Sequence, residues 1–327
     1  MREEYVTVET GQAHPRPRRR GGGRKWLRRE SNPLLLKELR GRMRGARAFV
    51  VLTVYLLLLS CFTSIIYYAY AASSRGPGGG PDMAYLGKVV FASVVMIEIF
   101  MVAFITPAFS AGAISGERER QTYELLRTTL LSARKLVFGK LTSALTYMFL
   151  LILAAVPLES LAFVLGGVVV EELALALVIL LVTAFAFAVI GMFFSTLART
   201  TLVSTVLTYS TALVTTIGIP VLLALSATLF GPLMYGGYGS STPSWAVRAA
   251  LNYALYITAG LSPITAAIFT EMALEEENTI WFFFTSVGSG RSIWIPSAWM
   301  VYTVAYVGLA LVLLLVIVLR VRRQEDR

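Results

Sequence analysis

Few side chains in this sequence could perform covalent chemistry. Its 327 residues contain one Cys, Cys61, and one His, His14. A zinc site generally needs several Cys or His ligands, and a Ser-His-Asp or Cys-His site would depend on His14, which lies in a stretch rich in Gly, Arg and Pro. The pair Gly139-Lys140 is not a phosphate-binding loop, because Leu141 follows it where Ser or Thr is required. We therefore expect no enzymatic activity, no metal and no cofactor bound by this chain.

A single carboxylate inside an apolar run is the first polar candidate. Glu98 stands in the middle of the run VVMIEIFMVAF. An ionisable residue at membrane depth is costly and is a functional candidate by default. No Lys or Arg lies at mid-depth in the predicted spans. We therefore expect Glu98 to make a polar contact between helices, within the chain or across a dimer, ahead of a direct role with substrate.

The second candidate is a charged stretch between two apolar runs, ISGERERQTYELLRTTLLSARKLVFGK at residues 114–140. Ser115 can cap a helix, acids occupy the first turn, and Tyr123, Leu125 and Leu126 give the helix an apolar side. Two interpretations are open. The stretch is either a solvated connector that carries positive charge, or a short helix that docks a cytoplasmic partner, which explains the apolar side.

Long apolar runs must position these candidates. The sequence is 56% hydrophobic with a mean hydropathy of +0.69, whereas soluble domains are roughly 45–50% apolar. Runs of about 20 apolar residues are long enough to cross a membrane as helices. The sequence therefore predicts an all-α polytopic membrane protein with a six-span domain over residues 48–320. The spans are expected at residues 48–71, 89–109, 136–165, 173–196, 202–230 and 297–320.

The segment between spans five and six, residues 231–296, has no such simple pattern. It is apolar enough to enter a bilayer, but Arg248, Asn252, Gly260 and Pro263 interrupt it. Irregular backbone at membrane depth is tolerated only where protein or a water-filled cavity covers it. We expect one or two short re-entrant or interfacial helices here, without specifying their fold.

Positive charge alternates with the spans. The net charge is +10, and Lys and Arg gather in residues 1–47, 110–140 and 320–327. Six spans place both termini on one side, which the positive-inside rule assigns to the cytoplasm of a multi-pass protein of the cell membrane. This distribution indicates control of topology and not nucleic-acid binding. Residues 1–23 predict a disordered basic tail, and residues 321–327 a second cytoplasmic tail.

Residues 24–47 predict an amphipathic helix that lies on membrane lipids. Asn32 can cap this helix, with Pro33 at its first position. Leu35, Leu39 and Met43 then share one face of the helix, and cations lie between the apolar residues along the sequence. This pattern is typical of a helix in the membrane interface.

Two of these segments resemble the membrane subunit of ABC-2 type ABC transporters. The similarity lies in NPLLLKELRGRMRG before the first span, and in SGERERQTYELL and TTLLSARKLVFGK between spans two and three. By this resemblance the first segment is the interface helix and the second is the coupling helix, on the cytoplasmic side. The matching interface-helix residues are Asn32, Pro33, Lys37, Glu38 and Arg40. The coupling-helix residues expected to dock an ATPase are Glu117, Arg118, Glu119, Thr122, Tyr123, Glu124 and Leu125.

The resemblance implies a permease that exports its substrate with ATP hydrolysed by a separate cytoplasmic ABC subunit, which holds the ATP and Mg²⁺. It also implies a second permease copy or a related permease. The scarcity of mid-membrane charges favours a hydrophobic, lipid-like or polymeric substrate. Two other classes stay open: a secondary transporter that needs no ATPase, and a membrane anchor or assembly factor for a cytoplasmic partner. Co-purification of an ATPase would distinguish the ATP-driven exporter from these two classes.

Overall fold

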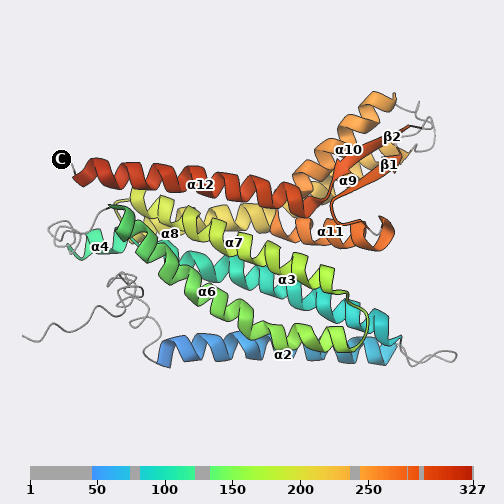
Figure 1. The fold of residues 1–327 in the computed structure, drawn as a ribbon, viewed down its shortest axis with the longest axis horizontal. Helices are drawn as coiled ribbons and strands as arrows, with labels where there is room; N and C mark the ends of the chain where they lie inside the picture. The colour runs from blue at the N-terminus through green and yellow to red at the C-terminus, as the bar shows by residue number, and fades with distance from the viewer. Residues whose placement is uncertain are drawn as a thin grey trace, which may run out of the picture. The chain divides into compact units, whose positions relative to one another are not determined.

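The computed structural model describes residues 46–73, 82–121, 133–235, 244–277, 279–286 and 291–325. By their contacts, the described residues all belong to one unit. The described residues are mainly helical, and six of their helices are long and apolar enough to cross a membrane (Figure 1). This confirms the predicted all-α, six-span fold. The predicted interface helix, with Asn32, Pro33, Lys37, Glu38 and Arg40, lies outside the described residues.

Each of the six long helices overlaps one of the predicted spans, whose bounds in a membrane stay a prediction. In chain order they are α2 (Ala46–Ser73), α3 (Met83–Ser110), α6 (Ala133–Val164), α7 (Val170–Leu197), the broken helix α8–η1–α9, and α12 (Ala298–Glu325). The short helix α4 (Ser115–Glu119) follows α3 after one turn. Hydropathy is sufficient to locate these helices in the sequence, because each is a continuous run of apolar residues long enough to cross the hydrocarbon core of a membrane.

Helix α7 is the centre of the bundle. It is the most buried of the six spans and packs against α3, α6, α8, α11 and α12 (Figure 1). Small residues let it approach its neighbours closely: a side chain at Gly191 would collide with Ser110 of α3. Close packing at small residues is a main source of affinity between membrane helices, because lipid tails are as apolar as the helices themselves.

The fifth span is peripheral and irregular. Helix α8 (Thr201–Leu213) passes through one turn of π-helix, η1 (Val214–Gly218), into α9 (Ile219–Tyr235), and this span is the least buried of the six. Pro220 has no N–H to donate to the carbonyl of Thr216, so the regular hydrogen-bond pattern is broken here. Single π-turns inside α-helices are frequent at functional sites.

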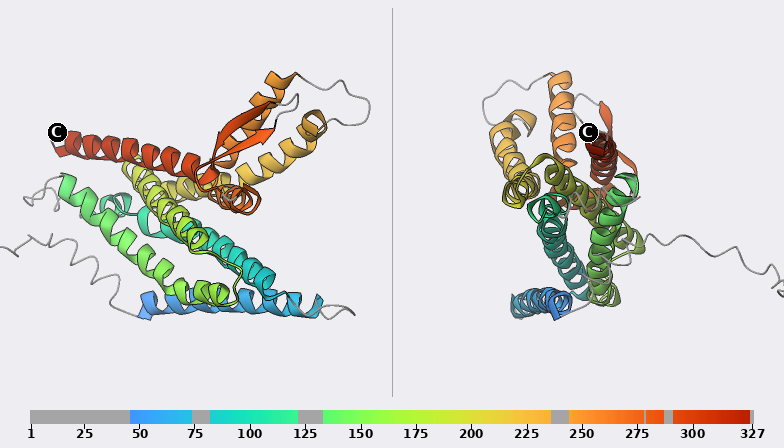
Figure 2. Two further views of the ribbon diagram at one scale, coloured as in Figure 1. Left: turned by 45° about the vertical axis from the view of Figure 1, so that its right-hand side comes forward. Right: turned by 90° about the vertical axis from the view of Figure 1, so that its left-hand side faces the viewer.

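Two short helices fill much of the segment between spans five and six, namely α10 (Trp245–Ala259) and α11 (Pro263–Glu277). One or two short re-entrant or interfacial helices were predicted here, and whether α10 and α11 enter or lie on a bilayer stays a prediction. A hairpin of β1 (Phe282–Ser286) and β2 (Ser292–Pro296) was not predicted; its strands are antiparallel, with Phe284 opposite Trp294. Aromatic and β-branched residues favour these strands. Figure 2 shows the hairpin beside α10, and Tyr253 of α10 donates a hydrogen bond to the carbonyl of Trp294 at 2.7 Å.

Candidate functional site

The first candidate site is α4 and the turn before it, at the end of α3. Ile114 and Ser115 are buried, and Ile114 belongs to an apolar cluster with side chains of three spans. That cluster includes Val137 of α6, Val189 of α7 and Ile317 of α12. The start of α4 therefore lies where these three spans meet, at the end of the bundle that holds the C-terminal end of α12 (Figure 1).

Ser195 of α7 secures the first turn of α4. Its hydroxyl accepts hydrogen bonds from the backbone N–H of Ile114 at 2.8 Å and of Ser115 at 2.9 Å. These donors belong to the first turn, which has no partners within the helix. The prediction that Ser115 caps this helix was wrong. The helix begins at Ser115 itself, whose hydroxyl donates to the carbonyl of Ala111 at 3.2 Å, and the capping oxygen comes from a different span.

The charged side chains of α4 contact the ends of neighbouring spans. Glu117 forms an ion pair with Lys140 of α6 at 3.0 Å, and the Lys140 side chain is only 7% exposed. Arg118 donates to the carbonyl of Thr196 at 3.2 Å and to that of Ala198 at 3.5 Å, at the C-terminal end of α7. A cation suits this end, because the last carbonyls of a helix lack partners and carry partial negative charge.

Glu119 completes the set at the start of α8. Its carboxylate accepts hydrogen bonds from the backbone N–H of Thr201 at 2.8 Å and from the Thr201 hydroxyl. Thr200 caps the same end by accepting from the N–H of Val203. An acid at a helix N-terminus is stabilised by the helix dipole. The three successive charged residues of α4 thus tie it to α6, α7 and α8.

Helix α4 is thus fixed to the bundle through several spans at once. A displacement of α4 must either carry the ends of three spans with it or break buried hydrogen bonds. Sequence reasoning selected Glu117, Arg118 and Glu119 but missed their partners Ser195 and Thr201, because residues about 80 positions apart give no pairing signal in one sequence. Thr122, Tyr123, Glu124 and Leu125 lie outside the described residues.

The second candidate, Glu98, is fully buried between helices. The hydroxyl of Tyr55 in α2 donates a hydrogen bond to one carboxyl oxygen of Glu98 at 2.9 Å. The carboxyl of Glu159 in α6 interacts electrostatically with Glu98. A contact between helices within one chain therefore exists, as one of the interpretations predicted. Glu159 is itself buried, with 4% of its surface exposed, and only the packing of α6 on α3 could reveal this.

The described residues contain no group of three or more His, Cys, Asp or Glu side chains that could hold a metal ion. The two candidates above are the hydrogen-bonded region around α4 and the Glu98 contact. Their arrangement is that of a membrane bundle with a short helix fixed to one end.

Comparison with known proteins agrees with this arrangement. The family model of the ABC-2 family transporter protein matches residues 33–322. A search of curated proteins found no match for this sequence. The matched range begins before the first span and continues into the last turn of the sixth, so it includes α4, its partners in α6, α7 and α8, and both helices between spans five and six. The chain therefore belongs to the ABC-2 family of transporter proteins, as a multi-pass membrane permease.

Proposed function

We propose that this permease exports a hydrophobic, lipid-like or polymeric substrate with ATP hydrolysed by a separate cytoplasmic ABC subunit. The observation that carries the proposal is the attachment of α4 to three spans through Glu117, Arg118, Glu119 and Ser195. A solvated connector has no need of such contacts. A segment that receives force from a partner needs them.

In the proposed cycle, ATP-driven closure of the partner pushes on the segment that contains α4. The Glu117–Lys140 ion pair passes this displacement to α6, and Ser195 and Arg118 pass it to α7. Helix α7 then moves against α3 and α12, its most extensive neighbours. Because packed helices shift between discrete arrangements and do not deform continuously, a small push at one end can change the packing of the whole bundle.

The surface of the spans supports an apolar cargo and a second permease copy or a related permease. Spans one and five leave most of their apolar side chains exposed, with Leu57, Leu202 and Leu222 each more than 60% accessible. Glu98 is fully covered and hydrogen-bonded to Tyr55, so it does not face these surfaces. A path along them would meet mainly hydrocarbon, which lipid-like molecules tolerate and small ions do not.

The experiment is co-purification of the tagged full chain from gently solubilised membranes, with ATPase activity measured in the eluate. We compare the wild type with a double variant, Glu117→Arg and Glu119→Arg, that reverses charge on both acids of α4. The control is Glu171→Arg, an exposed acid at the opposite end of α7. ATPase activity should accompany the wild type and the control, and should be lost from the double variant.

Two results would count against the proposal. If the double variant folds and retains full ATPase activity and transport, α4 does not receive the partner's force. If no ATPase accompanies the wild type in several detergents, the secondary transporter or the membrane anchor becomes the better account. Thermal unfolding of each variant separates a lost partner from a lost fold.

A further inference from the structure

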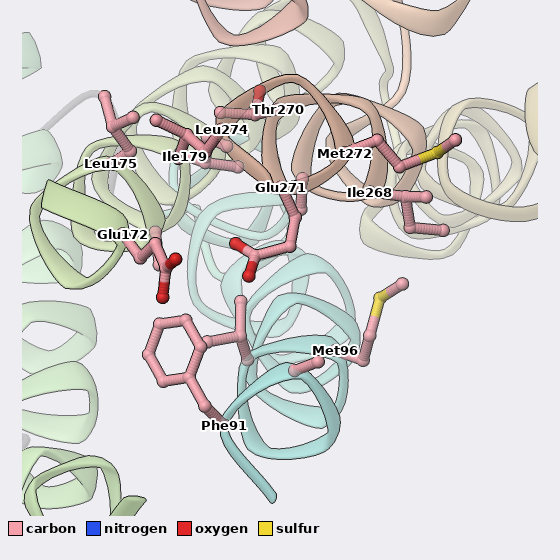
Figure 3. Close-up of a pocket in the computed structure, with 14 residues that line it drawn as sticks. Phe91, Met96, Glu172, Leu175, Ile179, Ile268, Thr270, Glu271, Met272 and Leu274 are labelled. Atoms are coloured by element: carbon pink, nitrogen blue, oxygen red, sulfur yellow. The ribbon is translucent and has the colours of Figure 1, made fainter. Parts of the chain in front are cut away.

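A mainly apolar cavity lies between α3, α7 and α11, at the end of the bundle opposite α4. Its volume is about 200 Å³. Figure 3 shows Phe91 and Met96 of α3 on one side, Leu175 and Ile179 of α7 on another, and Ile268 of α11 across from them. Pockets for drug-sized ligands typically measure about 300–1,000 Å³, so this cavity suits one alkyl chain better than a bulky ring system.

Two carboxyl groups give this apolar cavity a polar mouth. Glu172 of α7 and Glu271 of α11 both line it, and Figure 3 shows their carboxyl groups extending toward one another beside Phe91. Glu172 is buried and accepts a hydrogen bond from the N–H of Val169 at 3.2 Å. Glu271 accepts no hydrogen bond from the described residues, so its oxygens are open to a donor from a ligand.

The charges around this mouth do not balance. Lys88 of α3 forms an ion pair with Glu275 at 2.6 Å and lies 3.9 Å from Glu172. One cation among the described residues thus stands beside three carboxyl groups, those of Glu172, Glu271 and Glu275. Lys88 is engaged most closely with Glu275, which does not line the cavity. The mouth therefore favours a positively charged group.

We propose that this cavity binds an amphiphile with an ammonium headgroup and a single alkyl chain. The chain occupies the apolar space between Val95, Ile179 and Ile268, and the headgroup donates hydrogen bonds to Glu172 and Glu271. The ring of Phe91 at the same mouth adds an attraction between the cation and the aromatic face. Binding requires no ATPase subunit, so this inference stands or falls independently of the proposed export.

Proton uptake by Glu271 makes this binding depend on pH. Burial raises the pKa of the Glu271 carboxyl to about 7, the charges of Glu172 and Glu275 raise the pKa further, and Lys88 lowers it. An ammonium group prefers the ionised carboxylate. Between about pH 8 and pH 6 the ionised fraction of a group with a pKa near 7 falls roughly ten-fold, so affinity for the amphiphile should fall by a similar factor.

The test uses the purified full chain in phosphatidylcholine nanodiscs and a dodecylamine that carries a photoreactive diazirine on its chain. Mass spectrometry maps the labelled peptides after illumination at about pH 8 and about pH 6. The matched probe is the dodecyl alcohol with the same diazirine, which has the chain without the charge. At the higher pH the amine should label α3, α7 and α11 around the cavity far more than the alcohol does.

Three variants make the result decisive. Glu271→Gln should reduce labelling by the amine at the higher pH to the wild-type level at the lower pH, and should remove the pH dependence. Ala92→Trp, at an exposed position that lines the cavity, should block the chain while leaving both acids in place. Glu171→Gln changes an exposed acid next to Glu172 that does not line the cavity, and should behave as the wild type.

Equal labelling by amine and alcohol would overturn the proposal, because the cavity would then be an apolar groove that ignores charge. Unchanged labelling in Glu271→Gln would do the same. Labelling that persists in Ala92→Trp would place the probe elsewhere. If Glu271→Gln does not fold, Ala92→Trp and the comparison of probes in the wild type still decide the question.

Discussion

Replacing Ser195 by Ala tests the attachment of α4 most directly. The Ser195 hydroxyl accepts from two backbone N–H groups, those of Ile114 and Ser115, and all three residues are buried. Ala removes the acceptor and leaves both donors without a protein partner. Each buried donor left without a partner costs about 1–3 kcal/mol. Because α4 lies at an end of the bundle, where water can satisfy part of the loss, we expect a total near 2 kcal/mol.

Hydrogen–deuterium exchange of the purified chain measures this loss at the site itself. A local destabilisation of about 2 kcal/mol should speed exchange of the Ile114 and Ser115 amides about 30-fold. The matched control is Thr196→Val, which removes the neighbouring buried hydroxyl but keeps its shape. Among the described residues, that hydroxyl donates to the carbonyl of Phe193 in its own helix and to no atom of α4, so exchange in α4 should not change.

The outcome separates two accounts of α4. Exchange at the wild-type rate in Ser195→Ala would refute the reasoning, because the amides would then be protected without this oxygen. Equal acceleration in Ser195→Ala and Thr196→Val would also refute it, since the cause would be general loosening of the end of α7. Acceleration in Ser195→Ala alone supports the attachment.

Three further predictions follow from the packing. Gly191→Val should lower the thermal-unfolding midpoint by several degrees, because a side chain there collides with Ser110; a midpoint equal to that of wild type would show that α3 and α7 can separate. Tyr55→Phe should cost about 1–3 kcal/mol by chemical unfolding, because Glu98 loses its hydrogen bond, whereas Glu98→Gln should keep assembly and most transport. Since the pKa of Glu271 lies near 7 in the folded chain, stability should decline as pH rises from about 4.5 to above 7, and Glu271→Gln should flatten that decline.

Hydropathy accounts for most of what the sequence could predict. The six spans follow from continuous apolar runs, and the two short helices of residues 231–296 follow from an apolar stretch broken by Gly260 and Pro263. The hairpin escaped prediction because its strands are short and lie among other aromatic residues. Phe282 stacks on Trp294 with ring centroids 4.1 Å apart, a contact that exists only once the hairpin forms.

The candidate sites were predictable only in part. Charge and caps indicated that Glu117, Arg118 and Glu119 matter, yet their interpretation as docking residues did not foresee contacts with the protein's own spans. The cavity mouth could not be predicted, because Glu172 lies at the start of α7 and Glu271 lies in α11, within residues 231–296, whose fold the sequence did not specify. Such pairs depend on tertiary packing, which local propensity and periodicity do not encode.

The π-turn at Val214–Gly218 rotates the side chains of α9 around the helix axis relative to those of α8. Each residue of an α-helix advances about 100° around the axis, and a π-turn inserts one additional residue. A stripe of side chains on α8 therefore continues on α9 about 100° away from its straight extension. A scan of single cysteines in a Cys61→Ser background should thus reveal two lipid-accessible stripes offset by this angle, so neighbouring proteins or lipids can contact the two halves of one span independently.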